Sequence, residues 1–263
     1  MTALLFGKEG TSVGKGSGTG RHMGSRSIRE KTGKRERKMK IGLLIAIERE
    51  LEAFLASGEE RTEETVAGKT VYHTRMEGHD VYALQSGCGE IDAASGTTLL
   101  IVRYGCEMVV NFGVAGALEE DLRVEDLFVA EKVWHYDFDV TAFADTVKVG
   151  QYAEYPDEFI PLDAGLADLV AERIPGIRKI AVASADKFVE DRAEKLRLRE
   201  SGCGICEMEL AAIARVCERS HVKCLSIKCI SDAFDGTGAD FEKNVKRSAE
   251  RAFGAIREVL KAL

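Results

Sequence analysis

Hydrophobic and polar positions alternate in blocks along the chain, and the blocks predict strands separated by helices. The longer strands are predicted over residues 39–47, 107–112, 126–133, 178–184 and 224–230. The runs at 39–47 and 224–230 are nearly continuous in apolar residues, which is typical of strands buried on both faces. Three shorter runs, around 65–66, 70–76 and 81–86, are separated by glycine-containing turns and predict an antiparallel meander.

Helices are predicted between these strands. They begin near residues 48, 91, 163, 190, 209 and 240. The helix at 91–104 carries small residues on one side, which favours close packing, and the last helix repeats apolar residues at intervals of three and four. Strands that alternate with helices indicate an α/β three-layer sandwich, in which helices flank a mixed, mostly parallel central sheet.

The first 38 residues differ in composition from the rest of the chain. They are rich in glycine and serine, carry ten Lys/Arg against three Glu, and show no sustained apolar period. This composition predicts a disordered basic extension. Met39 then begins a single domain over residues 39–263, a length that is ample for one core.

Charge and cysteine content narrow the class of protein. The totals leave 27 basic and 41 acidic residues in 39–263, and such an acidic body argues against nucleic-acid binding. No apolar run reaches the ~20 residues that span a bilayer, and the N-terminal stretch lacks the apolar segment of a secretory signal. Seven cysteines in mostly apolar surroundings predict reduced thiols in a cytoplasmic protein.

Cofactor and metal motifs are also missing from the sequence. The histidines show no metal-ligand spacing. Gly113-Val114-Ala115-Gly116 fits neither the dinucleotide fingerprint nor a Walker loop. It offers backbone N–H groups and room for a ligand. We therefore expect neither a metal nor a cofactor.

Polar or glycine-rich segments follow four of the predicted strands, at 46–50, 113–117, 184–188 and 231–235. Ligand sites in α/β sheets collect at such strand ends and at helix starts, so we expect Glu209, at a helix start, and Asp232, at a strand end, to meet over one small molecule. Glu50, in the first turn after the first strand, is a further candidate. Each has a commoner structural interpretation. Glu50 and Glu209 fit solvated helix-start carboxylates, and Asp232 fits a turn cap.

Lys228 lies inside an apolar strand and also has two interpretations. It is either an edge residue whose stem lies along apolar surface while its ammonium reaches water, or a buried cation that faces carboxylates.

Five segments taken together resemble the methylthioadenosine/S-adenosylhomocysteine nucleosidases, which belong to the nucleoside phosphorylase/nucleosidase fold. The resemblance covers about residues 39–263, and its segments are 39–50, 110–118, 135–143, 206–214 and 230–232. The family implies an α/β sandwich around a mixed sheet, usually as a homodimer. It also implies hydrolysis of the N-glycosidic bond of a nucleoside to release adenine, in methionine salvage.

The resemblance assigns catalytic roles to three carboxylates. Asp232 is the general acid that protonates the purine at N7, with Ser231 beside it. Glu50 binds and activates the attacking water. Glu209 accepts hydrogen bonds from the ribose hydroxyls.

The resemblance also implies the remaining substrate contacts. Met208 lies along the sugar, Phe188 stacks on the purine, and the backbone of Val189 reads the adenine edge. Phe241 belongs to the pocket for the 5′-thio substituent, and Phe143 reaches the neighbouring site across the dimer. The other predicted binding residues are Ala46, Ala115, Gly116, Glu207 and Lys228.

Two departures from the family pattern leave the substrate open. Val114 replaces the usual serine, and Lys228 replaces the usual arginine, which keeps the charge without the bidentate fork. The alternatives are a phosphate-dependent purine nucleoside phosphorylase, an aminofutalosine hydrolase and a non-catalytic nucleoside-binding protein. A phosphorylase needs an arginine-built phosphate site, whereas Glu50 suits water and repels phosphate.

Overall fold

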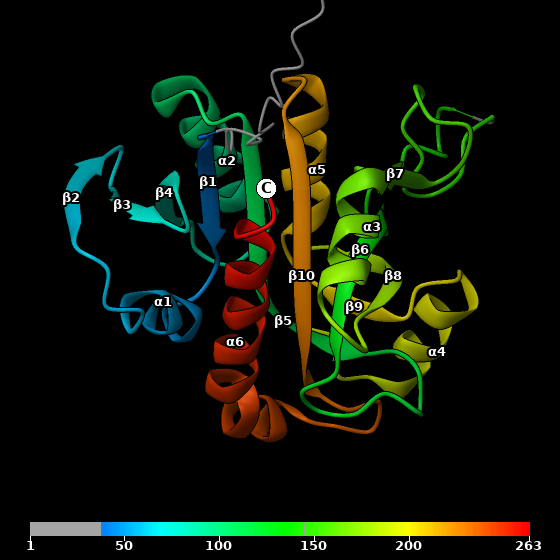
Figure 1. Cartoon of the computed structure of the whole chain (residues 1–263). Coiled ribbons are helices and arrows are strands. Elements are labelled where there is room, and N and C mark those ends of the chain that lie inside the picture. Colours follow the sequence, from blue (N-terminus) through cyan, green and yellow to red (C-terminus); the bar gives the residue numbers. More distant parts are fainter. Residues whose placement is uncertain (1–37, 145) are drawn as a thin grey trace, which may run out of the picture. The chain divides into compact units, whose positions relative to one another are not determined.

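The computed structural model describes residues 38–144 and 146–263. Apart from Lys38, the extension predicted to be disordered lies outside the described residues. Within the described part, ten strands form one mixed sheet (Figure 1). The strands are β1 Lys40–Ile45, β2 Arg61–Val66, β3 Lys69–Met76, β4 His79–Gln85, β5 Met108–Ala117, β6 Leu127–His135, β7 Phe159–Pro161, β8 Arg178–Ser184, β9 Ile205–Glu207 and β10 Lys223–Asp232.

Helices connect most of these strands, as the alternating pattern predicts. They are α1 Glu48–Leu55, α2 Glu90–Tyr104, α3 Ala164–Arg173, α4 Arg192–Glu200, α5 Leu210–Arg219 and α6 Gly238–Leu260. Asp163 caps α3 through a hydrogen bond from the Leu166 N–H to its Oδ1, 3.0 Å. Side chains of this type satisfy N–H groups that the first helical turn leaves without partners.

The sheet combines an open half with a closed half. In the open half, β4, β1, β5 and β10 pair in parallel, and the predicted meander β2–β3–β4 is antiparallel. In the other half, β5, β10, β6, β8 and β9 pair in a ring and close on themselves. The sequence patterns carry no sign of this closure.

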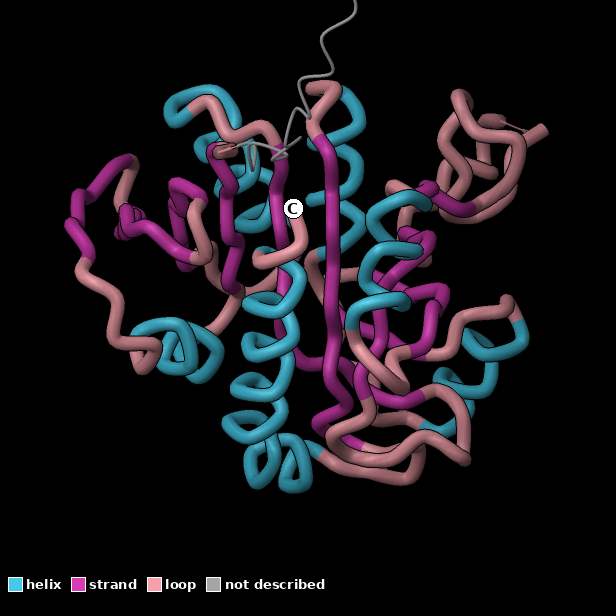
Figure 2. The backbone as a smooth tube through the Cα atoms, viewed as in Figure 1, coloured by secondary structure: helices cyan, strands magenta, loops and turns pink. Residues whose placement is uncertain are grey.

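Helices cover both faces of the sheet, which confirms the predicted layers (Figures 1 and 2). One apolar cluster joins α1, α3 and α6 to one face, and a second joins α2 and α5 to the other. Successive β1 residues illustrate the alternation, because Leu43 packs in the first cluster and Leu44 in the second. The small residues of α2 do allow close approach: a Cβ on Gly96 would lie 2.8 Å from Leu44 Cδ1.

Three local expectations need correction. The glycine-containing segment 113–117, predicted to follow the strand at 107–112, is instead the end of β5, where Gly116 and Ala117 pair with β9. Strands β7 and β9 have three residues each, too few for a periodic pattern to predict. The helix predicted to begin near residue 190 is α4; six of its nine residues are charged, and one of these, Lys195, is fully buried.

No helix in the described ranges is long and apolar enough to cross a bilayer.

Candidate functional site

A cavity of about 560 Å³ lies where β1, β5 and β10 end, close to the starts of α1 and α5. This volume is within the usual range for small-molecule sites. Most of the predicted site residues line it: Ala46, Glu50, Ala115, Gly116, Phe188, Glu207, Met208, Glu209, Ser231, Asp232 and Phe241. The structure therefore brings together the carboxylates of Glu50, Glu209 and Asp232, which lie on different elements of the fold.

Three predicted residues do not line this cavity. Val189 is buried and lines a smaller neighbouring cavity together with Phe188. Lys228 lies behind the wall, paired with Glu207. Phe143 is 81% exposed, so within one chain it contributes nothing to the site.

Glu50 is held by backbone N–H groups from two sides. Its Oε2 accepts hydrogen bonds from the N–H groups of Ala46 and Ile47, both 3.2 Å, and its Oε1 accepts one from Val114, 3.0 Å. Glu50 is only 4% exposed, which rules out the solvated helix-start interpretation. Burial raises the pKa of this carboxyl, while the Lys228 charge and these N–H groups oppose the increase.

A glycine on β5 makes this position possible. A Cβ on Gly113 would lie 2.1 Å from Glu50 Oε1. Only glycine leaves room for the carboxylate to approach the β5 backbone.

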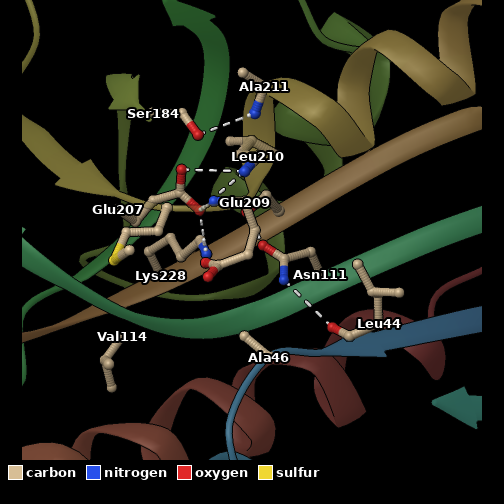
Figure 3. A network of polar contacts seen from close by, with 12 residues as sticks. Leu44, Ala46, Asn111, Val114, Ser184, Glu207, Glu209, Leu210, Ala211 and Lys228 are labelled. Carbon is tan, nitrogen blue, oxygen red and sulfur yellow. Dashed lines mark hydrogen bonds and ion pairs between the residues drawn. The ribbon is translucent and has the colours of Figure 1, made fainter. Parts of the chain in front are cut away.

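Glu207 lines the cavity, and its carboxylate pairs with Lys228 (Figure 3). Lys228 Nζ lies 2.8 Å from Glu207 Oε2, and both side chains are almost completely buried. Burial alone would lower the pKa of Lys228, but the surrounding carboxylates, Glu207 first, outweigh it and raise the pKa. Lys228 is thus a buried cation that faces carboxylates, as the sharper of its two interpretations predicts.

Glu207 also fixes the start of α5. Its carboxylate oxygens accept hydrogen bonds from the N–H groups of Leu210, 3.1 Å, and Glu209, 3.3 Å. Glu209 is the N-cap residue of α5, and its own Oε1 accepts a hydrogen bond from the Gly89 N–H, 3.0 Å. Burial, followed by the Glu207 charge, raises the pKa of Glu209 to about 7.

Asp232 ends β10 and is 3% exposed, so it is not a surface turn cap. Ser231 Oγ donates a hydrogen bond to its Oδ1, 2.9 Å. Burial raises the pKa of Asp232, and the Ser231 hydrogen bond and the charge of Lys195 oppose that increase. The surroundings therefore favour a carboxyl that keeps its proton to a higher pH than an exposed aspartate.

Sequence reasoning missed part of the cavity wall and a buried carboxyl behind it. The additional wall residues are Ile47, Glu48, Arg49, Cys88, Cys206, Glu242 and Val245. Glu90, at the start of α2, accepts hydrogen bonds from Ser184 Oγ, 2.6 Å, and from the Ala212 N–H. Burial first, and then the Glu207 charge, raises the pKa of Glu90 to about 8. The sequence held one signal for Glu90: it follows Gly87 and Gly89 at the start of a predicted helix.

Comparison with proteins of known sequence assigns this chain to a family. The sequence profile of the phosphorylase superfamily matches residues 40–261. The chain belongs to the phosphorylase superfamily. The relatives described next are methylthioadenosine/S-adenosylhomocysteine nucleosidases, which confirms the family resemblance found in the sequence.

Two relatives illustrate how similar this chain is to the methylthioadenosine/S-adenosylhomocysteine nucleosidases. The 5′-methylthioadenosine/S-adenosylhomocysteine nucleosidase of Shewanella piezotolerans is 31% identical over 233 residues, covering 86% of this chain and all of the relative. The enzyme of the same name from Haemophilus influenzae is 32% identical over 232 residues, with the same coverage.

Solved structures share the fold of this superfamily member. The S. pneumoniae nucleosidase with the transition-state inhibitor MT-ImmA superposes with a TM-score of 0.78 at 26% identity, covering 85% of this chain and 99% of that one. The futalosine hydrolase of Helicobacter pylori superposes with a TM-score of 0.80 at 27% identity, covering 86% and 98%.

The raised pKa of Glu90 predicts a specific dependence of stability on pH. The folded chain keeps the Glu90 proton up to about pH 8, whereas the unfolded chain loses it near its ordinary value of 4.5. The unfolding free energy should therefore fall as pH rises between these values. In Glu90→Gln, a neutral amide stands in for the protonated carboxyl, so urea unfolding should show a weaker fall between about pH 5 and pH 9.

Glu172→Gln is the matched control, because Glu172 is exposed on α3 and its removal should leave the wild-type dependence. Equal pH dependence in the wild type and Glu90→Gln would contradict a raised pKa at Glu90.

Proposed function

We propose that the protein hydrolyses the N-glycosidic bond of 5′-substituted adenosines, among them methylthioadenosine, S-adenosylhomocysteine and 5′-deoxyadenosine, to adenine and the free sugar. The observation that carries this proposal is the convergence of Glu50, Glu209 and Asp232 on one cavity. All three are buried, and burial raises the pKa of each. The relatives named as nucleosidases support the same reaction.

Asp232 acts as the general acid in this proposal. Cleavage of the bond develops oxocarbenium character on the sugar and negative charge on the base, so a proton delivered to purine N7 lowers the barrier. A positioned acid contributes typically about 10²–10⁴-fold. Its raised pKa keeps a proton available, and the Ser231 hydroxyl stabilises the carboxylate that remains.

Glu50 binds and activates the attacking water. Three backbone N–H groups fix its carboxylate and favour its ionised form, and the Lys228 charge acts in the same direction. The anionic group at this position repels phosphate, which supports water as the acceptor. The Val114 side chain lines the cavity here without a hydroxyl, so the water depends more heavily on Glu50.

Glu209 and the aromatic residues orient the substrate. Glu209 accepts hydrogen bonds from the ribose hydroxyls, with Met208 along the sugar. Phe188 stacks on the purine. Its ring lies edge-on to that of Phe241, with centroids 5.5 Å apart, which supports a 5′-substituent pocket beside the base pocket. The buried Val189 presents its backbone to the adenine edge.

Aminofutalosine hydrolysis is a second candidate, and one observation favours it. Arg49 is exposed and lines the cavity, and no ion-pair partner for it occurs among the described residues. A free guanidinium at the cavity mouth suits a 5′ substituent that ends in a carboxylate. The structural match to a futalosine hydrolase supports this candidate as well.

A phosphorylase and a non-catalytic binding protein have less support. Among the described residues that line the cavity, Arg49 is the one arginine, and it is exposed rather than part of an enclosed cluster. A binding protein has no need to bury three carboxylates around its ligand, because each burial costs free energy.

The reaction itself is the first test. The purified protein should release adenine from methylthioadenosine at the same rate with and without inorganic phosphate, measured by chromatography. A panel with S-adenosylhomocysteine, 5′-deoxyadenosine, aminofutalosine and inosine ranks the 5′ substituents by kcat/KM. Release that requires phosphate would favour the phosphorylase, and no release from any member would favour the binding protein.

Asp232→Asn tests the general acid. The amide fills the same space but cannot deliver a proton, so kcat should fall by about 10²–10⁴-fold while the melting temperature stays close to that of the wild type. Asp235→Asn, on the exposed side of the same loop, should keep full activity. A near-normal rate in Asp232→Asn would remove this residue from the acid role.

We further propose a homodimer in which Phe143 reaches the neighbouring cavity. Phe143 is largely exposed, and α2 carries two more exposed apolar side chains, Ile91 and Val102. These two are eleven residues apart, about three helical turns, so they share one helix face. Apolar side chains gathered on a surface commonly mark a protein interface.

Sedimentation velocity should find a species of twice the chain mass, and Val102→Asp should weaken the association. Phe143→Ala should raise KM for methylthioadenosine several-fold while the dimer persists. A monomer with full activity would overturn this assembly.

A further inference from the structure

Lys195 is a fully buried lysine on a helix that otherwise carries charge on its surface. Its side chain is 0% exposed. Its Nζ donates to the carbonyl oxygens of Ala233, Phe234 and Gly236, at 3.2, 3.0 and 3.5 Å. Three carbonyl acceptors match the three donors of an ammonium, so Lys195 ties the turn that follows β10 to α4.

The same ammonium faces the side chain of Asp232. Its Nζ lies 3.8 Å from Asp232 Oδ2, and the Asp232 side chain is 4% exposed. No other carboxylate within the described ranges forms an ion pair with Lys195. A lysine is rarely buried unless its charge is balanced, and Asp232 is the group that balances it.

The two oxygens of Asp232 thus have different partners. Ser231 Oγ donates to Oδ1 from the strand itself, and Lys195 approaches Oδ2 from α4. Two other titratable groups interact with Asp232. The charge of Asp240, on α6, acts on Asp232, and the charge of Asp232 acts on the Cys206 thiol of β9. Among these neighbours of Asp232, Lys195 is therefore the one that carries a positive charge.

We propose that Lys195 is a positioning residue for the general acid. It clamps the turn at residues 233–236, and its charge stabilises the carboxylate that Asp232 becomes after protonating the leaving base. This inference rests on the proposed nucleosidase function. In the step concerned, the O–H bond of Asp232 breaks, an N–H bond forms on the purine, and the electron pair of the glycosidic bond goes to the base. Lys195 transfers no proton in this step.

The charge of Lys195 determines the sign of the expected effect. A cation near a carboxyl favours the ionised form and lowers its pKa, by about one to three units for an opposite charge within ~4–6 Å. Removing the cation should make Asp232 hold its proton to higher pH while making it a weaker acid. In the profile of kcat/KM against pH, the alkaline limb should therefore shift to higher pH, and kcat at the optimum pH should fall.

Lys195→Gln separates the two roles, because the glutamine amide can still donate to the turn carbonyls but carries no charge. We expect the alkaline limb of its kcat/KM profile to move up by at least about one pH unit, with kcat lowered about tenfold. Lys195→Arg keeps the charge and should retain the wild-type limb. Lys246→Met, which removes an exposed lysine of α6, controls for the loss of one positive charge.

A double-mutant cycle distinguishes an electrostatic role from a purely structural one. In the Asp232→Asn background, Lys195→Gln should cause little further loss of kcat, because the carboxyl on which it acts is gone. Additive losses, or an unchanged alkaline limb in Lys195→Gln, would overturn the proposal and leave only a structural clamp.

The ¹³C chemical shift of the Asp232 carboxyl, followed against pH in both proteins, reports the same titration without turnover. If the wild type releases no adenine, the proposed function fails, and this titration still decides whether Lys195 controls Asp232. If the wild type is active and the titration is unchanged in Lys195→Gln, the Lys195 proposal fails alone.

Discussion

The buried ion pair between Lys228 and Glu207 connects the centre of the sheet to the start of α5. Because Glu207 also accepts the first N–H groups of that helix, it fixes the direction in which α5 leaves the sheet and places Glu209 at the cavity. Lys228 in turn offsets the charge of the neighbouring carboxylates, which would otherwise repel one another at low dielectric. Glu50, Glu207 and Glu209 therefore depend on Lys228, a cation that does not itself line the cavity.

Two carboxyls of the same cavity are suited to opposite tasks because their surroundings differ. Burial raises the pKa of Glu50, but three backbone hydrogen bonds and the Lys228 charge oppose that increase and support the ionised form that a base requires. Among the described residues, Asp232 accepts one hydroxyl hydrogen bond and no backbone N–H, with the Lys195 ammonium 3.8 Å away, and burial raises its pKa, so it is suited to carry a proton. An acid and a base whose environments differ in this way are the usual requirement for proton transfer at neutral pH.

The sequence was sufficient to predict those residues whose position follows from the ends of regular elements. Glu50 and Asp232 meet because β1 and β10 both pair in parallel with β5 and end on the same side of the sheet. Glu209 reaches them from the start of α5, after β9, which runs antiparallel to β5. The closed half of the sheet was not predictable, because its closure depends on β9, which has three residues. Lys195 was missed for a physical reason: it is held by backbone carbonyls of a distant turn, and carbonyls leave no mark in a sequence. Glu90 was missed because its partners, Ser184 and a helix N–H, are equally distant in the chain.

The central claim is that water, bound at Glu50, is the group that replaces the base on the sugar. Carrying out the reaction in ¹⁸O-labelled water and analysing the sugar product by mass spectrometry tests it most directly. We expect one labelled oxygen at the anomeric carbon of a free sugar when phosphate is also present. A sugar 1-phosphate without label at that carbon would contradict the account.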